Sequence, residues 1–185
     1  MRDTKHKLSP LTTALHWFVG LTIMTLLAMG VYMDSYEVYA LYDIHKSIGI
    51  IIVAFVLLRI IWRALNGWPE PVSQHSGIEY RMAKLVHWAL ITGTVVLPVS
   101  GMLMSVGGGH GLSIFGLELL SENVIPDNPQ MAVPLNETLA QTGKCLHGIV
   151  GNVMIAAIVL HVIGALKHHI VNKDGTLHRM LGGRL

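Results

Sequence analysis

The fold is decided by residues 145–166, CLHGIVGNVMIAAIVLHVIGAL, an apolar stretch that carries His147 and His161. A helix turns about 100° per residue, so fourteen steps bring the second histidine back to nearly the same face. At about 1.5 Å per residue the two imidazoles stand roughly 21 Å apart along the axis. That is most of the roughly 30 Å thickness of a bilayer's hydrocarbon core. One helix therefore offers an imidazole near each side of a membrane.

Three other stretches of the chain are long and apolar in the same way. Of the 185 residues, 52% are hydrophobic and 13% are charged, whereas a soluble domain carries about 25% charged residues. The four predicted spans cover about residues 13–33, 44–65, 83–106 and 143–166. We therefore predict an all-α fold in which residues 1–185 form one domain, a four-helix membrane bundle. Pro98 lies inside the third span and is expected to kink it.

The charged residues alternate between the two ends of the predicted spans. If the N-terminus is cytoplasmic, eleven of the thirteen Lys and Arg residues fall on that side: Arg2, Lys5, Lys7, Arg59, Arg63, Arg81, Lys84, Lys167, Lys173, Arg179 and Arg184. The other side holds Lys46 and Lys144, together with Asp34, Glu37, Asp43, Glu118, Glu122, Asp127 and Glu137. The positive-inside rule then predicts that both termini are cytoplasmic. The net charge of +2 does not indicate nucleic-acid binding, and membrane lipid is the expected surrounding.

Depth in the membrane sorts four histidines into two pairs. His16 begins the first span and His161 ends the fourth, so both are expected near the inner face. His45 begins the second span and His147 begins the fourth, so both are expected near the outer face. Imidazole is a ligand of haem iron, and helix bundles hold cofactors between facing helices. Each pair is therefore placed to clamp one haem, and two haems would form an electron path across the bilayer.

Two other interpretations of these histidines compete with haem ligation. A single histidine in an apolar helix is ordinarily a hydrogen-bonding contact between helices. Four histidines matched in depth favour ligation, because ionisable groups inside a membrane are costly without a role. Zinc prefers a tetrahedral cluster of closely placed ligands, whereas these histidines form separated pairs.

Two further residues are expected at the depth of the inner pair. Arg59 follows His45 by fourteen residues, so it shares the face of His45 and the depth of His161. Its guanidinium either pairs with a propionate of the inner haem or extends to the inner interface. His87 on the third span either donates to a propionate, lines a quinone pocket or bonds another helix. We do not expect His87 to be an axial ligand.

A few residues outside the pairs carry weaker predictions. Cys145, the one cysteine of the chain, is predicted to be an inert, packed thiol. His168 and His169 follow the fourth span, where they either lie at the interface or contact a propionate. Residues 113–120 are modestly apolar and suited to lie on the membrane surface.

The same segments resemble the bacterial cytochrome b561 family, a group similar to the membrane b-type cytochromes of nickel–iron hydrogenase and formate dehydrogenase. The resembling segments are LHWFVG (15–20), YDIHKSIGIIIVAFVLLRIIWR (42–63), LVHWALITGTVVLPVSGMLM (85–104), LHGIVGNVMIAAIVLHVIGALKHH (146–169) and KDGTLHRM (173–180). They cover nearly the whole chain outside residues 107–142. The resemblance implies two b haems between four helices, ligated by His16 with His161 and by His45 with His147.

The resemblance also implies electron transfer with quinone in a bacterial inner membrane, with ubiquinone as the expected electron acceptor or donor. The expected partner on the other side is a periplasmic or peripheral electron donor. One branch of the family oxidises superoxide, which makes the chain itself a candidate quinone oxidoreductase. The acidic outer side argues against superoxide, because an anion is guided by a positive entrance and only Lys46 and Lys144 lie near the outer pair.

Two alternative functions stay open from the sequence. The chain is either a haem-bearing anchor that relays electrons from a peripheral dehydrogenase or hydrogenase, or a proton-relay or transport protein without haem. In the second case the histidines would titrate rather than bind iron.

Overall fold

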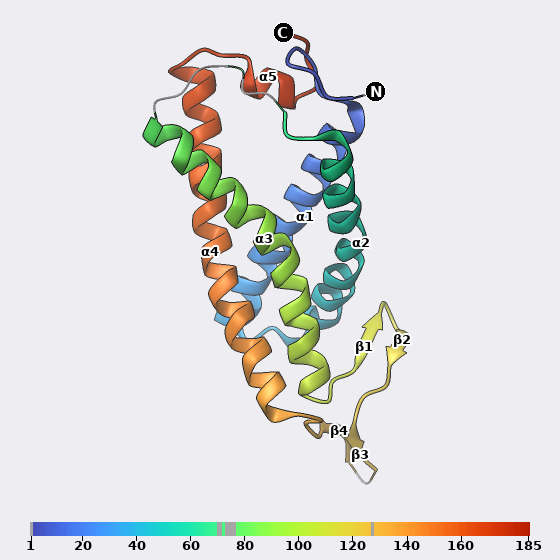
Figure 1. Ribbon diagram of the computed structural model, residues 1–185. Coiled ribbons are helices and arrows are strands. Elements are labelled where there is room, and N and C mark those ends of the chain that lie inside the picture. Colours follow the sequence, from blue (N-terminus) through green and yellow to red (C-terminus); the bar gives the residue numbers. More distant parts are fainter. Residues whose placement is uncertain (1, 70–71, 73–76, 127) are drawn as a thin grey trace.

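Four long helices make up most of the molecule (Figure 1). The computed structural model describes residues 2–69, 72, 77–126 and 128–185. The helices are α1 (Pro10–Tyr36), α2 (Tyr42–Asn66), α3 (Gly77–Gly107) and α4 (Glu137–Ile170). Each contains one predicted span and extends beyond it at both ends. All four are long and apolar enough to cross a membrane, so the predicted four-helix membrane bundle is confirmed in its helices.

Polar side chains cap the starts of α1 and α4. The Ser9 side chain accepts a hydrogen bond from the Thr12 backbone N–H at 3.1 Å, and Pro10 occupies the first turn of α1. The Asn136 side chain accepts from the Leu139 N–H at 2.9 Å at the start of α4. Because these caps lie outside the hydrocarbon-length stretches, α1 and α4 begin before the spans predicted from hydropathy.

The two ends of the bundle differ in structure. The terminal end holds both chain termini and the short helix α5 (Thr176–Met180), as Figure 1 shows. The loop end holds the residues between α1 and α2 and those between α3 and α4. It contains the short helix η1 (Tyr39–Leu41) and the strands β1 (Leu112–Ile114), β2 (Leu117–Leu120), β3 (Val124–Ile125) and β4 (Asn128–Ala132). These strands form two antiparallel hairpins, β1–β2 and β3–β4.

The hairpin β1–β2 is attached to α2. It is formed by the segment that the sequence suggested for the membrane surface, residues 113–120. At its turn, the Phe115 N–H donates to the Ser47 hydroxyl at 2.9 Å, and Ser47 is only 1% exposed. Ser47 follows His45 by two residues on α2, so the hairpin is attached to α2 at the depth of one of the predicted site histidines.

The bundle contains two adjacent helix pairs. Helix α4 packs closely along α3, and α1 packs along α2. A Cβ atom on Gly143 of α4 would lie 2.9 Å from the Ser100 carbonyl oxygen of α3, so only glycine permits this approach. Helix α3 runs through Pro98 without a break.

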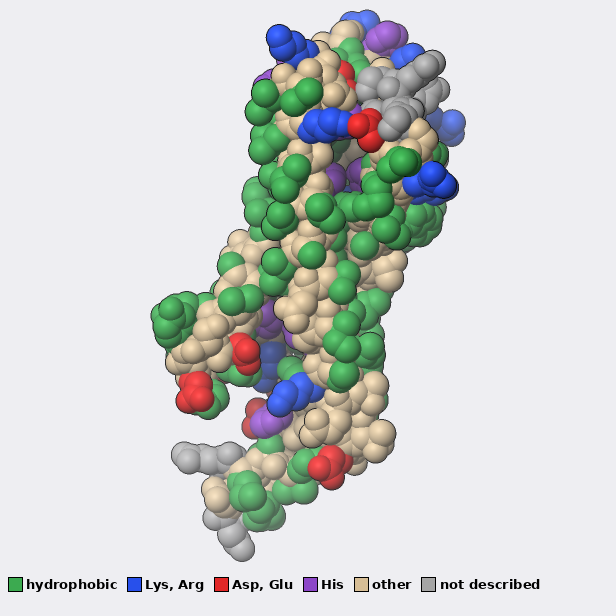
Figure 2. Space-filling model, turned by 90° about the vertical axis from the view of Figure 1, so that its left-hand side faces the viewer, with side chains coloured by type: hydrophobic (Ala, Val, Ile, Leu, Met, Phe, Trp, Pro, Cys, Tyr) green, Lys and Arg blue, Asp and Glu red, His purple; other side chains and the backbone are tan. Residues whose placement is uncertain are grey.

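A small apolar core joins all four helices. Its buried members are Val19, Ile23 and Leu26 of α1, Ile52 and Val56 of α2, Leu97 of α3 and Met154 of α4. Met154 lies midway in sequence between His147 and His161, so this layer separates the two histidine levels. Within the apolar stretch of each helix, only 11–28% of the residues are buried. Figure 2 shows apolar side chains along the shaft, the surface expected of a helix bundle in lipid.

Charged side chains gather at the two ends of the shaft (Figure 2). Lys and Arg predominate at the terminal end in this view, and Asp and Glu are more frequent at the loop end. This is the distribution on which the predicted orientation depends. Of the predicted outer acidic residues, Asp127 lies outside the described residues.

Candidate haem sites between the helices

The structure brings the four histidines together as the two pairs expected from depth. At the terminal end, the His16 ring of α1 and the His161 ring of α4 have centroids 6.1 Å apart. At the loop end, the His45 ring of α2 and the His147 ring of α4 are also 6.1 Å apart. We call these the terminal-end pair and the loop-end pair. In both histidine pairs, one ring comes from α4 and the other comes from α1 or α2.

This separation fits two imidazoles on opposite sides of one metal ion. An imidazole nitrogen binds a metal at about 2 Å, so two opposed rings have centres about 6 Å apart. The ring planes are inclined by 54° in the terminal-end pair and by 74° in the loop-end pair. Within the described ranges, no group of three or more His, Cys, Asp or Glu side chains is placed to hold a metal. Two imidazoles per site is the donor set of a six-coordinate b haem.

In the loop-end pair, the protonation of His147 is fixed by α3. Its Nδ1 lies 2.9 Å from the Leu97 carbonyl oxygen and 3.2 Å from the Ser100 hydroxyl. A carbonyl oxygen only accepts hydrogen bonds, so Nδ1 carries the proton and Nε2 keeps its lone pair for a metal. By contrast, Nδ1 of His45 is buried and has no hydrogen-bond partner among the residues that the structure describes.

The terminal-end pair lies among groups that can carry positive charge. Arg59 of α2 places Nη2 3.4 Å from Nδ1 of His16. The guanidinium therefore lies at the histidine pair, at the depth that helical spacing predicted. An arginine beside a haem ligand is suited to bind a haem propionate, and that role stays a prediction.

His87 of α3 is a third imidazole at the terminal end. Its ring centroid is 5.2 Å from that of His161, with the rings nearly perpendicular at 85°. Its Nδ1 lies 2.6 Å from the Ala83 carbonyl oxygen, so Nδ1 carries the proton. Sequence reasoning found no partner for His87, because its nearness to His161 depends on how α3 crosses α4.

A buried carboxylate that sequence reasoning missed ties the N-terminal segment to α2. Asp3 is 3% exposed at its side chain and accepts hydrogen bonds from the Ser9 N–H at 2.8 Å and the Thr12 hydroxyl at 2.9 Å. Arg63 lies 3.3 Å away. Burial alone would raise the pKa of Asp3, but these hydrogen bonds and the Arg63 charge outweigh burial and hold the pKa below its ordinary value.

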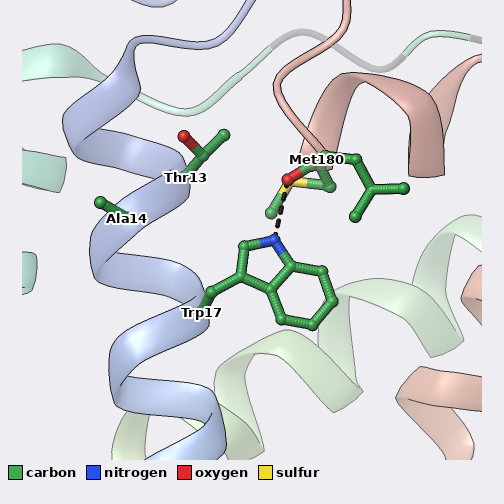
Figure 3. Close-up of a pocket in the computed structure, with 5 residues that line it drawn as sticks. Thr13, Ala14, Trp17 and Met180 are labelled. Carbon is green, nitrogen blue, oxygen red and sulfur yellow. Dashed lines mark hydrogen bonds between the residues drawn. The ribbon is translucent and has the colours of Figure 1, made fainter.

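A shallow hollow lies beside the terminal-end pair. It is lined by Thr13, Ala14, Trp17, Met180 and Leu181 and has a volume of about 420 Å³ (Figure 3). The Trp17 indole N–H donates to the Met180 carbonyl oxygen at 2.9 Å, which ties α5 to α1. The Trp17 ring also contacts His16, with centroids 5.5 Å apart. The hollow was not expected from the sequence, because its two walls lie 163 residues apart in the chain.

The structure also places three residues outside the histidine pairs, Cys145, His168 and His169. Cys145 is exposed, so the prediction of a packed thiol is wrong. Two residues correspond to about 200° around a helix, which turns Cys145 away from the face of His147. His168 lies 2.7 Å from the Asp174 carboxylate of the C-terminal segment, whereas His169 is exposed.

Four membrane-crossing helices with two paired sets of imidazoles define a class, the membrane cytochromes whose haems lie between helices. The chain matches the family described as prokaryotic cytochrome b561 over residues 7–183, and it belongs to that family. It is therefore a haem-containing, multi-pass membrane protein.

Named relatives cover almost the full length of the chain. It is 28% identical over 185 residues to cytochrome b561 homolog 2 of Escherichia coli (strain K12), which covers 97% of this chain and 94% of that protein. It is 30% identical over 179 residues to the probable superoxide oxidase CybB of Yersinia pestis, covering 95% of this chain and 96% of that protein. Cytochrome b561 homolog 1 of Escherichia coli is 27% identical over 175 residues, with 92% and 94% covered.

Proposed function

We propose that this chain is a single-domain, di-haem electron-transfer protein of a bacterial inner membrane. His16 and His161 would hold one haem b, and His45 and His147 would hold the other. The observation that carries the proposal is the equal 6.1 Å separation of the rings in both pairs. Both pairs share α4, so the two sites have a fixed spacing along one rigid element.

The surrounding residues suit one-electron transfer. His16 with His161, and His45 with His147, would each hold a haem b that could accept and release single electrons. The apolar layer around Val19, Ile52 and Met154 excludes water between the two sites. Arg59 provides positive charge at the terminal-end site, where it favours the reduced, less positive form of the haem iron.

The proposed orientation of the two sites in the membrane rests on the charge distribution. With both termini in the cytoplasm, the loop-end pair faces the periplasm and the terminal-end pair lies near the inner face. The electron donor would approach the loop end, and ubiquinone would exchange electrons near the terminal-end pair.

Superoxide is one candidate donor, because a relative at 30% identity is named a probable superoxide oxidase. At the loop end, Lys46 is paired with Asp43 at 3.6 Å, which weakens its attraction for an anion. We therefore keep the donor open between superoxide and a periplasmic redox protein.

One observation favours the second candidate, an anchor subunit for a larger enzyme. Phe115 and Leu117 of the hairpin β1–β2 are 64% and 66% exposed, and exposed apolar side chains on a loop are typical of a contact with a partner or membrane. Copurification of an iron–sulphur protein with the chain would support this function.

The test is to quantify haem per chain in purified protein and to measure reduction of ubiquinone by the isolated protein. The proposal predicts two haems b per chain and quinone reduction without another subunit. Haem without quinone reduction would favour the anchor function. Protein that is folded but has no haem absorption would refute both.

A further inference from the structure

Helix α3 contributes no histidine to either pair, yet it makes two hydrogen-bond contacts with His147. The imidazole Nδ1 lies 2.9 Å from the Leu97 carbonyl oxygen and 3.2 Å from the Ser100 hydroxyl oxygen. The same Ser100 hydroxyl donates to the Leu97 carbonyl at 2.9 Å. The His147 Nδ1, the Leu97 carbonyl oxygen and the Ser100 hydroxyl oxygen thus lie within hydrogen-bonding distance of one another. We call this part of α3 the Leu97–Gly101 turn.

This turn is built to receive the ring. Ser100 is 1% exposed and Leu97 is 6% exposed, so neither polar atom has access to bulk water. A Cβ on Gly101 would lie 3.2 Å from Cε1 and 3.3 Å from Nδ1 of His147, closer than a side chain ordinarily approaches. Glycine at this position therefore lets the imidazole reach the backbone.

The other ligand of the loop-end pair lacks such support. His45 Nδ1 has no hydrogen-bond partner in the described part of the chain. Its ring packs against Gly30, where an added Cβ would lie 3.6 Å from Cε1 of His45. The loop-end pair is therefore asymmetric. One imidazole has its tautomer and orientation fixed by two acceptors, and the other is held by packing.

We propose that the Leu97–Gly101 turn is a positioning element for His147 that sets the redox potential of the loop-end haem. This inference rests on the proposed function. A hydrogen bond from Nδ1 fixes the ring plane and makes Nε2 a more basic ligand. A more basic ligand stabilises the oxidised iron, so the turn lowers the potential of the loop-end haem and leaves the terminal-end haem unaffected.

The test compares Ser100→Ala and Gly101→Ala with wild-type protein by redox titration and by electron paramagnetic resonance of the oxidised haems. A His147→Ala sample identifies the loop-end signal. The matched control is Thr94→Val, which removes another buried α3 hydroxyl that donates to a carbonyl three residues earlier, Ile91, at 2.7 Å.

Ser100→Ala should keep both haems and raise the potential of the loop-end haem alone. The expected shift corresponds to about a two- to tenfold change in its reduction equilibrium, the size of one neutral hydrogen bond. Gly101→Ala should push the ring from Leu97 and change the loop-end resonance signal or release only that haem. Thr94→Val should change neither haem.

The proposal is overturned if the loop-end potential and resonance signal are the same in wild type, Ser100→Ala and Gly101→Ala. Equal shifts of both haems would also overturn it, because the turn contacts only one pair. If wild-type protein binds no haem, the proposed function fails instead. Nitrogen-15 spectra of His147 would then still report whether Nδ1 carries the proton, as the turn requires.

Discussion

The two histidine pairs have the same ring separation but different surroundings. The loop-end pair is contacted by neutral hydrogen-bonding groups, the Leu97 carbonyl and the Ser100 hydroxyl. The terminal-end pair has the Arg59 guanidinium beside His16 and the His87 ring beside His161. The ligands alone would make the two haems alike. The groups around the ligands are therefore expected to separate their potentials, with the terminal-end haem the easier to reduce.

The largest expected effect comes from removing one ligand of each pair. His161→Ala should lower the haem content from two per chain to about one by removing the terminal-end haem, because a b haem held by two helices loses half of its protein ligands. His147→Ala should do the same at the loop end. Haem quantification and visible spectra of the two variants measure this.

The pairing is wrong if either variant keeps both haems. His87→Ala is the matched control, because His87 lies beside His161 without belonging to either pair. It should retain two haems per chain.

The next-largest effect is expected from removing the positive charge beside the terminal-end pair. Arg59→Leu should keep both irons six-coordinate and lower the terminal-end potential on the order of 60 mV, about tenfold in the reduction equilibrium, because a positive neighbour is lost. The loop-end potential should change much less. Redox titration measures both values in one sample.

Arg59→Lys is the control for this effect, since it keeps the charge and loses the planar guanidinium. An unchanged terminal-end potential in Arg59→Leu would reject the electrostatic role of Arg59.

The smallest effect is expected from replacing Asp3, whose contacts stabilise the fold at the terminal end of the bundle. Asp3→Asn should lower the free energy of unfolding by about 1–3 kcal/mol, because the charged partner of Arg63 and of two hydrogen-bond donors is lost. Thermal unfolding in detergent at neutral pH measures the difference from wild type.

The stabilisation by Asp3 should also depend on pH. Its folded-state pKa lies below the ordinary value of 3.8, so the ionised carboxylate stabilises the fold above that pH. This contribution is lost as the pH falls through the lowered pKa. The wild type should then approach Asp3→Asn in stability, and a difference that persists in stronger acid would argue against the ion pair.

The positions of the helices, and of residues along each helix, could be predicted from the periodicity of the sequence. Hydropathy located all four helices, and the spacing of His147 and His161 on α4 led to the pairs whose rings lie together in the structure. The fourteen-residue step from His45 to Arg59 placed the guanidinium at the other pair for the same reason. A residue's depth and face within one helix follow from counting alone.

The contacts that depend on how separate segments pack against each other could not be predicted from the sequence. His87 approaches His161 because of how α3 crosses α4, and His147 reaches the α3 backbone beside Gly101. The short hairpins at the loop end have too few residues for a clear alternating pattern, and Asp3 acts through contacts with α2 far along the chain. None of these is visible in the periodicity of a single segment.

The two-haem arrangement is tested most directly by a redox titration of the visible spectrum of purified wild-type protein, repeated with His147→Ala. We expect two b haems with separate potentials in wild type, and loss of the lower-potential component in His147→Ala. A single component in wild type, or loss of the higher-potential component in the variant, would contradict it.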